Sequence, residues 1–134
     1  MNFNSRTQAY QNAEKQALEE LTDPHQIVLV MIESLLKSMT IFVDNIDVKN
    51  GNAELKSKHF ARSLTIIYAL QSSLDFEKGG DIANSLFQLY EYARQKLIGD
   101  LTKGVAEGTP SALEALGEIR DAWHAIGRKA GHGE

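Results

Sequence analysis

Four histidines and no cysteine are available for chemistry in this chain of 134 residues. His25, His59, His124 and His132 include no pair four residues apart, so the paired zinc ligands of an HExxH motif are missing. Asp121 and His124 are three residues apart, but a di-metal site in a helical bundle needs two such motifs and two further inward-facing glutamates. The absence of cysteine excludes disulfides and thiolate ligands. We therefore expect no metal and no cofactor, with Asp121 and His124 on the solvated surface.

His59 is a candidate for phosphotransfer, because helical bundles carry such histidines. Its neighbours Lys56, Lys58 and Arg62 would attract a phosphate group. Four residues further along stands Ser63, where a glycine would give better access to the ring. The alternative is a histidine that is simply exposed near the start of a helix.

The glycine pair Gly79-Gly80 lacks the spacing of a phosphate-binding loop and follows no strand. We expect it to form the turn between two helices, with Asp81 capping the second of them. Ser72, Ser73 and the scattered carboxylates have no base or orienting partner at a suitable spacing. No catalytic residue is indicated, and the chain is not expected to be an enzyme.

Between the glycine and proline joints the apolar residues follow helical periodicity. The pattern predicts helices over Arg6–Glu20, Pro24–Ile46, Ala53–Leu74, Ile82–Lys103 and Pro110–Ile126. Four long helices joined by short loops predict an all-α, antiparallel four-helix bundle with an additional short N-terminal helix. Asp23 and Thr109 each precede a proline and are expected to cap the helix that follows.

Composition agrees with one soluble domain over residues 1–134, with a flexible tail at 128–134. Hydrophobic residues make up 43% and charged residues 24%, and the net charge of −4 argues against a chain-wide nucleic-acid surface. The longest strictly apolar run, Ile27 to Ile32, is far shorter than the ~18–20 residues of a membrane span. We expect a cytoplasmic protein that does not insert into membranes.

Three features of the predicted helices lead to specific expectations. The helix from Pro24 is apolar over more than one stripe and should lie centrally. The N-terminal helix has a stripe rich in alanine around Tyr10, which should dock weakly, so residues 1–20 form a displaceable segment. Tyr90 and Tyr92 lie about 200° apart on a helix, so only one of them can face the core.

Residues 74–86 closely resemble the signature of the flagellin export chaperones, the FliS-type flagellar secretion chaperones. The chain reads Leu-Asp-Phe-Glu-Lys-Gly-Gly-Asp-Ile-Ala-Asn-Ser-Leu, against a family pattern of Leu-Asp-x-Glu-Lys-Gly-Gly-Glu-Ile-Ala-x-Asn-Leu. The continuation Leu-Tyr-Glu-Tyr at 89–92 resembles the family's Leu-Tyr-Asp-Tyr, and Asp-Pro-His-Gln at 23–26 resembles its Ser-Pro-His-Gln/Glu. Ala9-Tyr10 and Trp123 have counterparts as well. The resemblance runs through nearly the whole chain in order.

The resemblance implies a binding protein of the cytoplasm. Members of this family hold flagellin by its disordered C-terminal segment, prevent premature polymerisation and deliver flagellin to the type III export gate. The partner segment folds into helices that wrap the bundle. Two other classes stay open on the residues alone, a histidine phosphotransfer bundle and a helical interaction scaffold with another partner.

Under that resemblance Tyr10 is the expected anchor of a lid over the flagellin-binding groove. The remaining groove candidates, which could equally be pure core, are Ile67, Leu70, Leu86, Leu89, Tyr90, Ala93 and Leu97. Glu77, Lys78, Gly79 and Gly80 match the signature and are expected mainly to fix the turn between the third and fourth helices.

Overall fold

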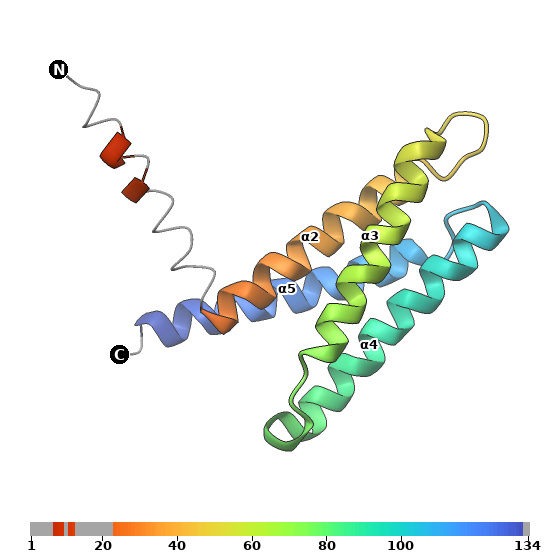
Figure 1. Ribbon diagram of the computed structural model, residues 1–134. Coiled ribbons are helices and arrows are strands. Elements are labelled where there is room, and N and C mark those ends of the chain that lie inside the picture. The colour runs from red at the N-terminus through yellow and green to blue at the C-terminus, as the bar shows by residue number, and fades with distance from the viewer. Residues whose placement is uncertain (1–6, 10, 13–22, 133–134) are drawn as a thin grey trace.

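The chain folds into long helices packed side by side. The computed structural model describes residues 7–9, 11–12 and 23–132, which contain no strand. Its long helices are α2 (Pro24–Asp44), α3 (Ala53–Ser72), α4 (Phe76–Lys103) and α5 (Thr109–His132) (Figure 1). The predicted all-α class is confirmed. Residues 7–9 and 11–12 are helical, and the rest of the predicted N-terminal helix lies outside the described residues.

Successive helices run antiparallel. The α2–α3 and α4–α5 connections lie at one end of the bundle, and the α3–α4 turn lies at the other end (Figure 1). α2 packs most extensively, against α3 and α5, while α4 packs against α3 and α5 from the far side. This arrangement agrees with the predicted four-helix bundle and with the expected central position of α2.

Side-chain caps set the beginnings of the first three long helices. Asp23 accepts a hydrogen bond from the His25 amide at 3.0 Å, as its place before Pro24 predicts. Asn52 caps α3 in the same way through the amide of Leu55. Each cap satisfies an amide that has no partner within the helix.

The core consists of apolar stripes from all four long helices. Tyr90 is buried and Tyr92 is 38% exposed, so the prediction that only one of them faces the core is confirmed. The buried cluster comprises Ile32, Leu35, Met39, Phe42, Ile46, Ile67, Leu70, Tyr90, Ala93, Leu97, Ala112 and Leu116.

By length and composition α2 could also cross a membrane, which the short apolar run at its start did not indicate. It is the one such helix in the part of the chain that the structure describes. Its apolar residues pack against α3 and α5, as those of a bundle's central helix do. We therefore interpret it as a core helix.

Several helix boundaries differ from the periodicity-based expectation. α3 ends at Ser72, two residues before Leu74, and α5 is helical to His132, six residues beyond Ile126. The largest difference is at α4, which begins at Phe76 and not at Ile82. The helical path there includes the glycine pair, which the sequence placed in a turn.

A polar clasp joins α3 to α4 on one side of the bundle. The Gln71 side chain donates to the Glu91 carboxylate at 3.3 Å, and Arg94 donates to the same carboxylate at 2.9 Å. The Arg94 hydrogen bond holds the pKa of Glu91 at about 2. Glu91 therefore stays ionised, and the clasp persists, throughout the neutral range.

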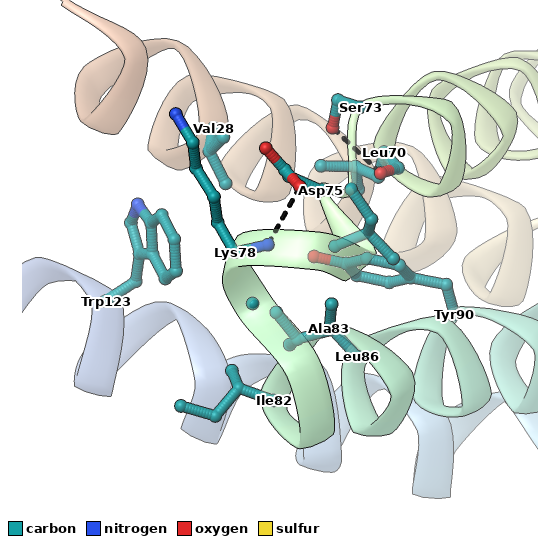
Figure 2. Close-up of a pocket in the computed structure, with 12 residues that line it drawn as sticks. Val28, Leu70, Ser73, Asp75, Lys78, Ile82, Ala83, Leu86, Tyr90 and Trp123 are labelled. Atoms are coloured by element: carbon teal, nitrogen blue, oxygen red, sulfur yellow. Dashed lines mark hydrogen bonds between the residues drawn. The ribbon is translucent and has the colours of Figure 1, made fainter.

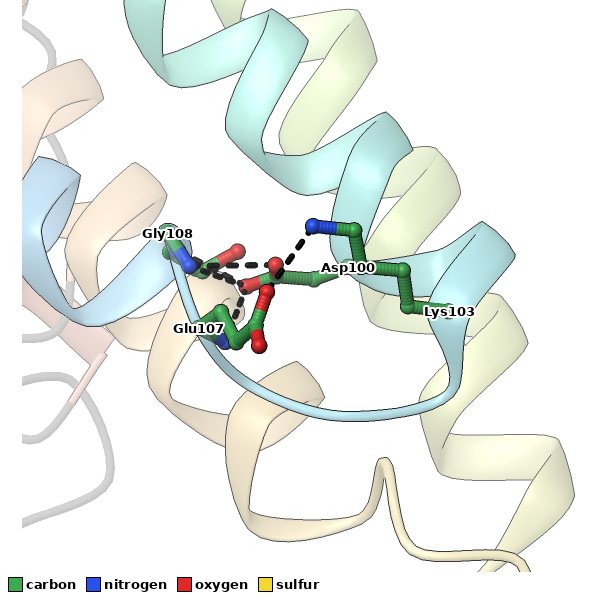
Figure 3. A network of polar contacts seen from close by, with 5 residues as sticks. Asp100, Lys103, Glu107 and Gly108 are labelled. Atoms are coloured by element: carbon green, nitrogen blue, oxygen red, sulfur yellow. Dashed lines mark hydrogen bonds and ion pairs between the residues drawn. The ribbon is translucent and has the colours of Figure 1, made fainter.

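Asp100 ties the end of α4 to the start of α5 (Figure 3). Its carboxylate, in a residue only 3% exposed, accepts from the backbone amides of Glu107, Gly108 and Thr109 at 2.7–3.1 Å. Burial by itself raises the pKa of Asp100, but these amides outweigh burial, and the pKa lies below the usual 3.8. The carboxylate thus satisfies amides at the beginning of α5 that lack helical partners.

Replacing this carboxylate should loosen the α4–α5 connection. Asp100→Ala should lower the free energy of unfolding at pH 7 by about 2–3 kcal/mol, because it leaves buried amides unpaired. A group whose pKa is lowered by folding stabilises fully above its unfolded value, so the deficit should shrink as pH falls below 3.8. Urea unfolding across that range measures it. Asp44→Ala, at an exposed position, is the control and should change stability by less than ~0.5 kcal/mol.

Candidate functional site

An apolar pocket of about 320 Å³ opens at the end of the bundle that carries the α3–α4 turn (Figure 2). It is built by α2, α3, α4, α5 and the turn itself. Its lining residues are Val28, Leu70, Ser73, Leu74, Asp75, Lys78, Gly79, Ile82, Ala83, Leu86, Tyr90 and Trp123. We call this the turn pocket.

The turn pocket owes its shape to a kink at Gly80. Gly80 has φ 49° and ψ −123°, a conformation that residues with a Cβ rarely adopt. Asp75 begins the helical turn before the kink by accepting from the Lys78 amide at 3.0 Å. The prediction that the glycine pair forms the turn between two helices is wrong, because both glycines lie inside α4 and only Gly80 leaves the helical conformation. The cap that starts α4 is Asp75 and not Asp81.

Gly79 is needed for a different reason. A Cβ at this position would lie 2.8 Å from the Cβ of Ala83, one helical turn further along α4. The two glycines therefore let the turn fold closely over the start of α4, which places Lys78 and Gly79 at the wall of the pocket. The signature residues thus lie in the kinked first turns of α4 and form part of the site.

Buried side chains make the floor of the turn pocket, and partly exposed ones make its walls. Leu70, Ala83 and Tyr90 are almost fully buried. Val28 and Trp123 are half-buried and stand on α2 and α5. A ligand that entered would therefore be surrounded mainly by apolar groups, which favours apolar side chains.

Trp123 is held in place by the start of α2. Its indole N–H donates to the His25 carbonyl at 3.0 Å, and the two rings stack with centroids 4.9 Å apart. The His25 ring in turn fills the space over Gly127, where an added Cβ would clash with His25 Nε2. These contacts with His25 therefore fix the position of Trp123 in the pocket wall, although the two residues lie far apart in the sequence.

A second apolar pocket, of about 270 Å³, lies between α4 and α5. It is lined by Asp81, Ile82, Ser85, Leu86, Leu89 and Ile119. Ile82 and Leu86 line both apolar pockets, and Ile82 is 70% exposed between them. The two pockets therefore adjoin along α4 and together form an apolar surface suited to an amphipathic segment.

A third pocket, of about 350 Å³, is mainly polar. It lies further along α4 towards the Asp100 connection and is flanked by Tyr92, Lys96 and Lys103. Lys96 lies over the Tyr92 ring at 5.2 Å, and Lys103 pairs with Glu107 at 2.8 Å. Its charges are thus already engaged with neighbours.

The structure divides the groove candidates into two groups. Leu70, Leu86 and Tyr90 line the turn pocket, and Leu89 lines the second pocket. Ile67, Ala93 and Leu97 are completely buried and line none of the three pockets, so they are core residues here. Their contact with a partner stays a prediction. Tyr10 lies outside the described residues.

The signature residues also separate. Lys78 and Gly79 line the turn pocket, Gly80 supplies the kink, and Glu77 is exposed in the first turn of α4. Val28, Ser73 and Leu74 line the turn pocket although they were not among the groove candidates. Val28 and Leu74 belong to apolar helical patterns, which do not show that they border a pocket, and Ser73 lies in the α3–α4 connection.

The histidine chemistry considered from the sequence looks different in the structure. His59 is half-buried, and its Nδ1 lies 3.2 Å from Ser38 Oγ on α2, so the expectation of a simply exposed ring is wrong. Asp121 and His124 are exposed as predicted, and Asp121 pairs with Arg120 at 3.0 Å. Within residues 7–9, 11–12 and 23–132 no group of three His, Asp or Glu side chains is placed to hold a metal ion.

Comparison with known proteins connects this fold to flagellar export. The family model described as flagellar protein FliS matches residues 6–130. The flagellar secretion chaperone FliS of Vibrio cholerae is 28% identical over 119 residues, covering 89% of this chain and 86% of that protein. The Salmonella typhimurium FliS is 27% identical, covering 91% and 90%, and Pseudomonas aeruginosa FliSB is 23% identical, covering 87% and 91%.

The kink that forms the turn pocket can be tested by two matched substitutions. At both Gly80 and Gly117 an added Cβ would meet nothing within 4 Å, so backbone conformation decides the outcome. Gly80→Ala should destabilise the fold by about 1–3 kcal/mol, because alanine is strained at this φ. Gly117→Ala, in α5 without a positive φ, should stabilise it by about 0.5–1 kcal/mol. Denaturant unfolding followed by circular dichroism measures both, and equal effects would contradict the kink.

Proposed function

Because the chain belongs to the flagellar protein FliS family, we propose that it binds the disordered C-terminal segment of flagellin in the cytoplasm. In this role it prevents premature polymerisation and delivers flagellin to the type III export gate. The match of the family model to residues 6–130 is the observation that carries the proposal. Flagellar secretion chaperones are binding proteins, not a class of enzyme.

The surface along α4 supports this function physically. The turn pocket and the second apolar pocket adjoin at Ile82 and Leu86, so one amphipathic helix could place apolar side chains in both. Recognition of this kind buries the apolar face of a helix in a groove and leaves its polar face in water.

A disordered substrate also suits a chaperone that must later release what it binds. Ordering the segment on binding consumes about 2–5 kcal/mol or more of the gross interaction energy. A large apolar contact can therefore remain reversible. While it is bound, the C-terminal segment of flagellin is unavailable to other flagellin molecules, which is how the chaperone would prevent polymerisation.

Mixing the chain with flagellin tests the proposal directly. Full-length flagellin should form a stoichiometric complex that elutes as one species in size-exclusion chromatography. Flagellin without its C-terminal segment should elute separately, because the segment supplies the apolar contacts. Equal binding of both forms, or of neither, would contradict the proposed function.

The proposal that residues 1–20 form a displaceable lid gives a second prediction. Removal of residues 1–20 should leave the bundle of α2–α5 folded and should tighten flagellin binding by about threefold or more, since a competing segment no longer covers the groove. Isothermal calorimetry measures the affinity, and circular dichroism checks the fold. Tyr10→Ala should shift the affinity in the same direction. Unchanged affinity in both variants would contradict the proposal that residues 1–20 cover the groove.

A further inference from the structure

The floor of the turn pocket contains a hydroxyl group without a partner. Tyr90 is only 2% exposed, and Figure 2 shows its ring reaching into the pocket with the hydroxyl foremost. The part of the chain that the structure describes offers this hydroxyl no hydrogen bond. A ligand that covered this hydroxyl without offering it an acceptor would leave it unpaired, which costs free energy.

Burial also decides what Tyr90 can do. The pKa of Tyr90 is raised above its usual 10.0 by burial, so the side chain is a neutral phenol at physiological pH. It therefore keeps a proton to donate. A ligand that brings an acceptor oxygen to the pocket floor would satisfy it.

Lys78 adds positive charge to the same pocket. It is exposed near the start of α4, and Figure 2 shows its side chain extending between Trp123 and Val28, two other residues of the pocket lining. No ion pair to Lys78 is formed among residues 23–132. The other charged lining residue, Asp75, directs its carboxylate to the backbone amide of Lys78 at 3.0 Å, where it caps α4.

The remaining polar groups of the pocket are already occupied. The Trp123 indole N–H donates to the His25 carbonyl, and the Ser73 hydroxyl donates to the Leu70 carbonyl at 2.8 Å. The groups left for a ligand are thus a hydroxyl donor and an ammonium group. Both favour an anionic oxygen, while the walls favour apolar atoms.

Building on the proposed function, we infer that the turn pocket is a selective anchor site for the flagellin segment. It takes an apolar side chain that has a carboxylate within one helical turn. The apolar side chain fills the space above the floor, and the carboxylate accepts from the Tyr90 hydroxyl and pairs with Lys78. Residues three or four apart lie on one face of a helix, so both groups of the segment can face the pocket together.

Removing the hydroxyl alone is the sharpest test. Tyr90→Phe keeps the ring and therefore the core, so stability should be unchanged or slightly higher. Flagellin binding should weaken by about threefold to tenfold, the range for one lost hydrogen bond. Tyr68→Phe removes a hydroxyl from a tyrosine that is 73% exposed outside the pocket, and it should bind like the unmodified chain. Calorimetry with flagellin measures all three proteins.

Reversing the charge tests the second contact. Lys78→Glu should weaken flagellin binding by about tenfold, and the loss should diminish at high salt. Lys58→Glu makes the same change at an exposed site near the other end of the bundle, and it should alter the affinity less than twofold, a small change by the usual scale for surface charges. Normal affinity of both Tyr90→Phe and Lys78→Glu would overturn the anchor site.

The occupant is identified by cross-linking from Ile82, which is exposed at the edge of the pocket. A photoreactive benzoylphenylalanine at this position should cross-link to the flagellin C-terminal segment, at an apolar residue with Asp or Glu within four positions. A cross-link to residues 1–20 of the chaperone in the purified complex, or to a part of flagellin without a nearby carboxylate, would overturn the inference.

These outcomes separate the two proposals. If the unmodified chain does not bind full-length flagellin, both the proposed function and the anchor site are wrong. If binding requires the C-terminal segment of flagellin but Tyr90→Phe and Lys78→Glu bind with normal affinity, the proposed function stands and only the anchor site is wrong.

Discussion

The burial of α2 determines which of the other helices can border a pocket. Its apolar residues cover more than one stripe, and burial of apolar surface is the dominant favourable term in folding. α3 and α5 cover this surface from two sides, which leaves α4 to pack on their outer flanks. The three pockets described above are all lined by α4. α4 completes the bundle but takes no part in its most extensive contact, which is between α2 and α3. Such a helix is well placed to border a binding surface.

The signature turn shows how one local feature can serve both fold and site. Its glycines permit a tight path, and Asp75 pairs with the amide that the path leaves free. The same path brings Lys78 to the mouth of a pocket whose floor comes from helices on either side of the turn. A change in the turn therefore alters both the stability of the connection and the shape of the site, and stability measurements are needed to interpret any binding defect there.

Much of the fold follows from the sequence because helices depend on local pattern. The Asp23-Pro24 cap, the central position of α2 and the division between Tyr90 and Tyr92 all follow from spacing and geometry. The start of α4 does not, since Gly-Gly is usual both in a loop and in a kink. Here the cap at Asp75 starts the helix before the glycines, so that they fall at a kink inside α4.

The site is harder to predict for a related reason. Periodicity shows which residues face inwards, but it does not show whether another side chain fills the space in front of them. Leu97 and Leu86 belong to the same apolar stripe of α4, yet one is sealed in the core and the other borders two pockets. Trp123 joins the site from the far end of the sequence, through contacts with His25 that no local pattern records.

A polar group at the floor of an apolar pocket changes what the surface can distinguish. Apolar burial has little directional preference, so an amphipathic helix could slide by one turn along the α4 surface at small cost. A hydroxyl at the floor of the pocket discriminates more strongly, because a segment in the wrong register would cover it without supplying an acceptor. The apolar pockets would then provide most of the affinity for an unfolded substrate, and Tyr90 would fix which part of the substrate lies there. Such a division suits a chaperone that must recognise one segment and later release it.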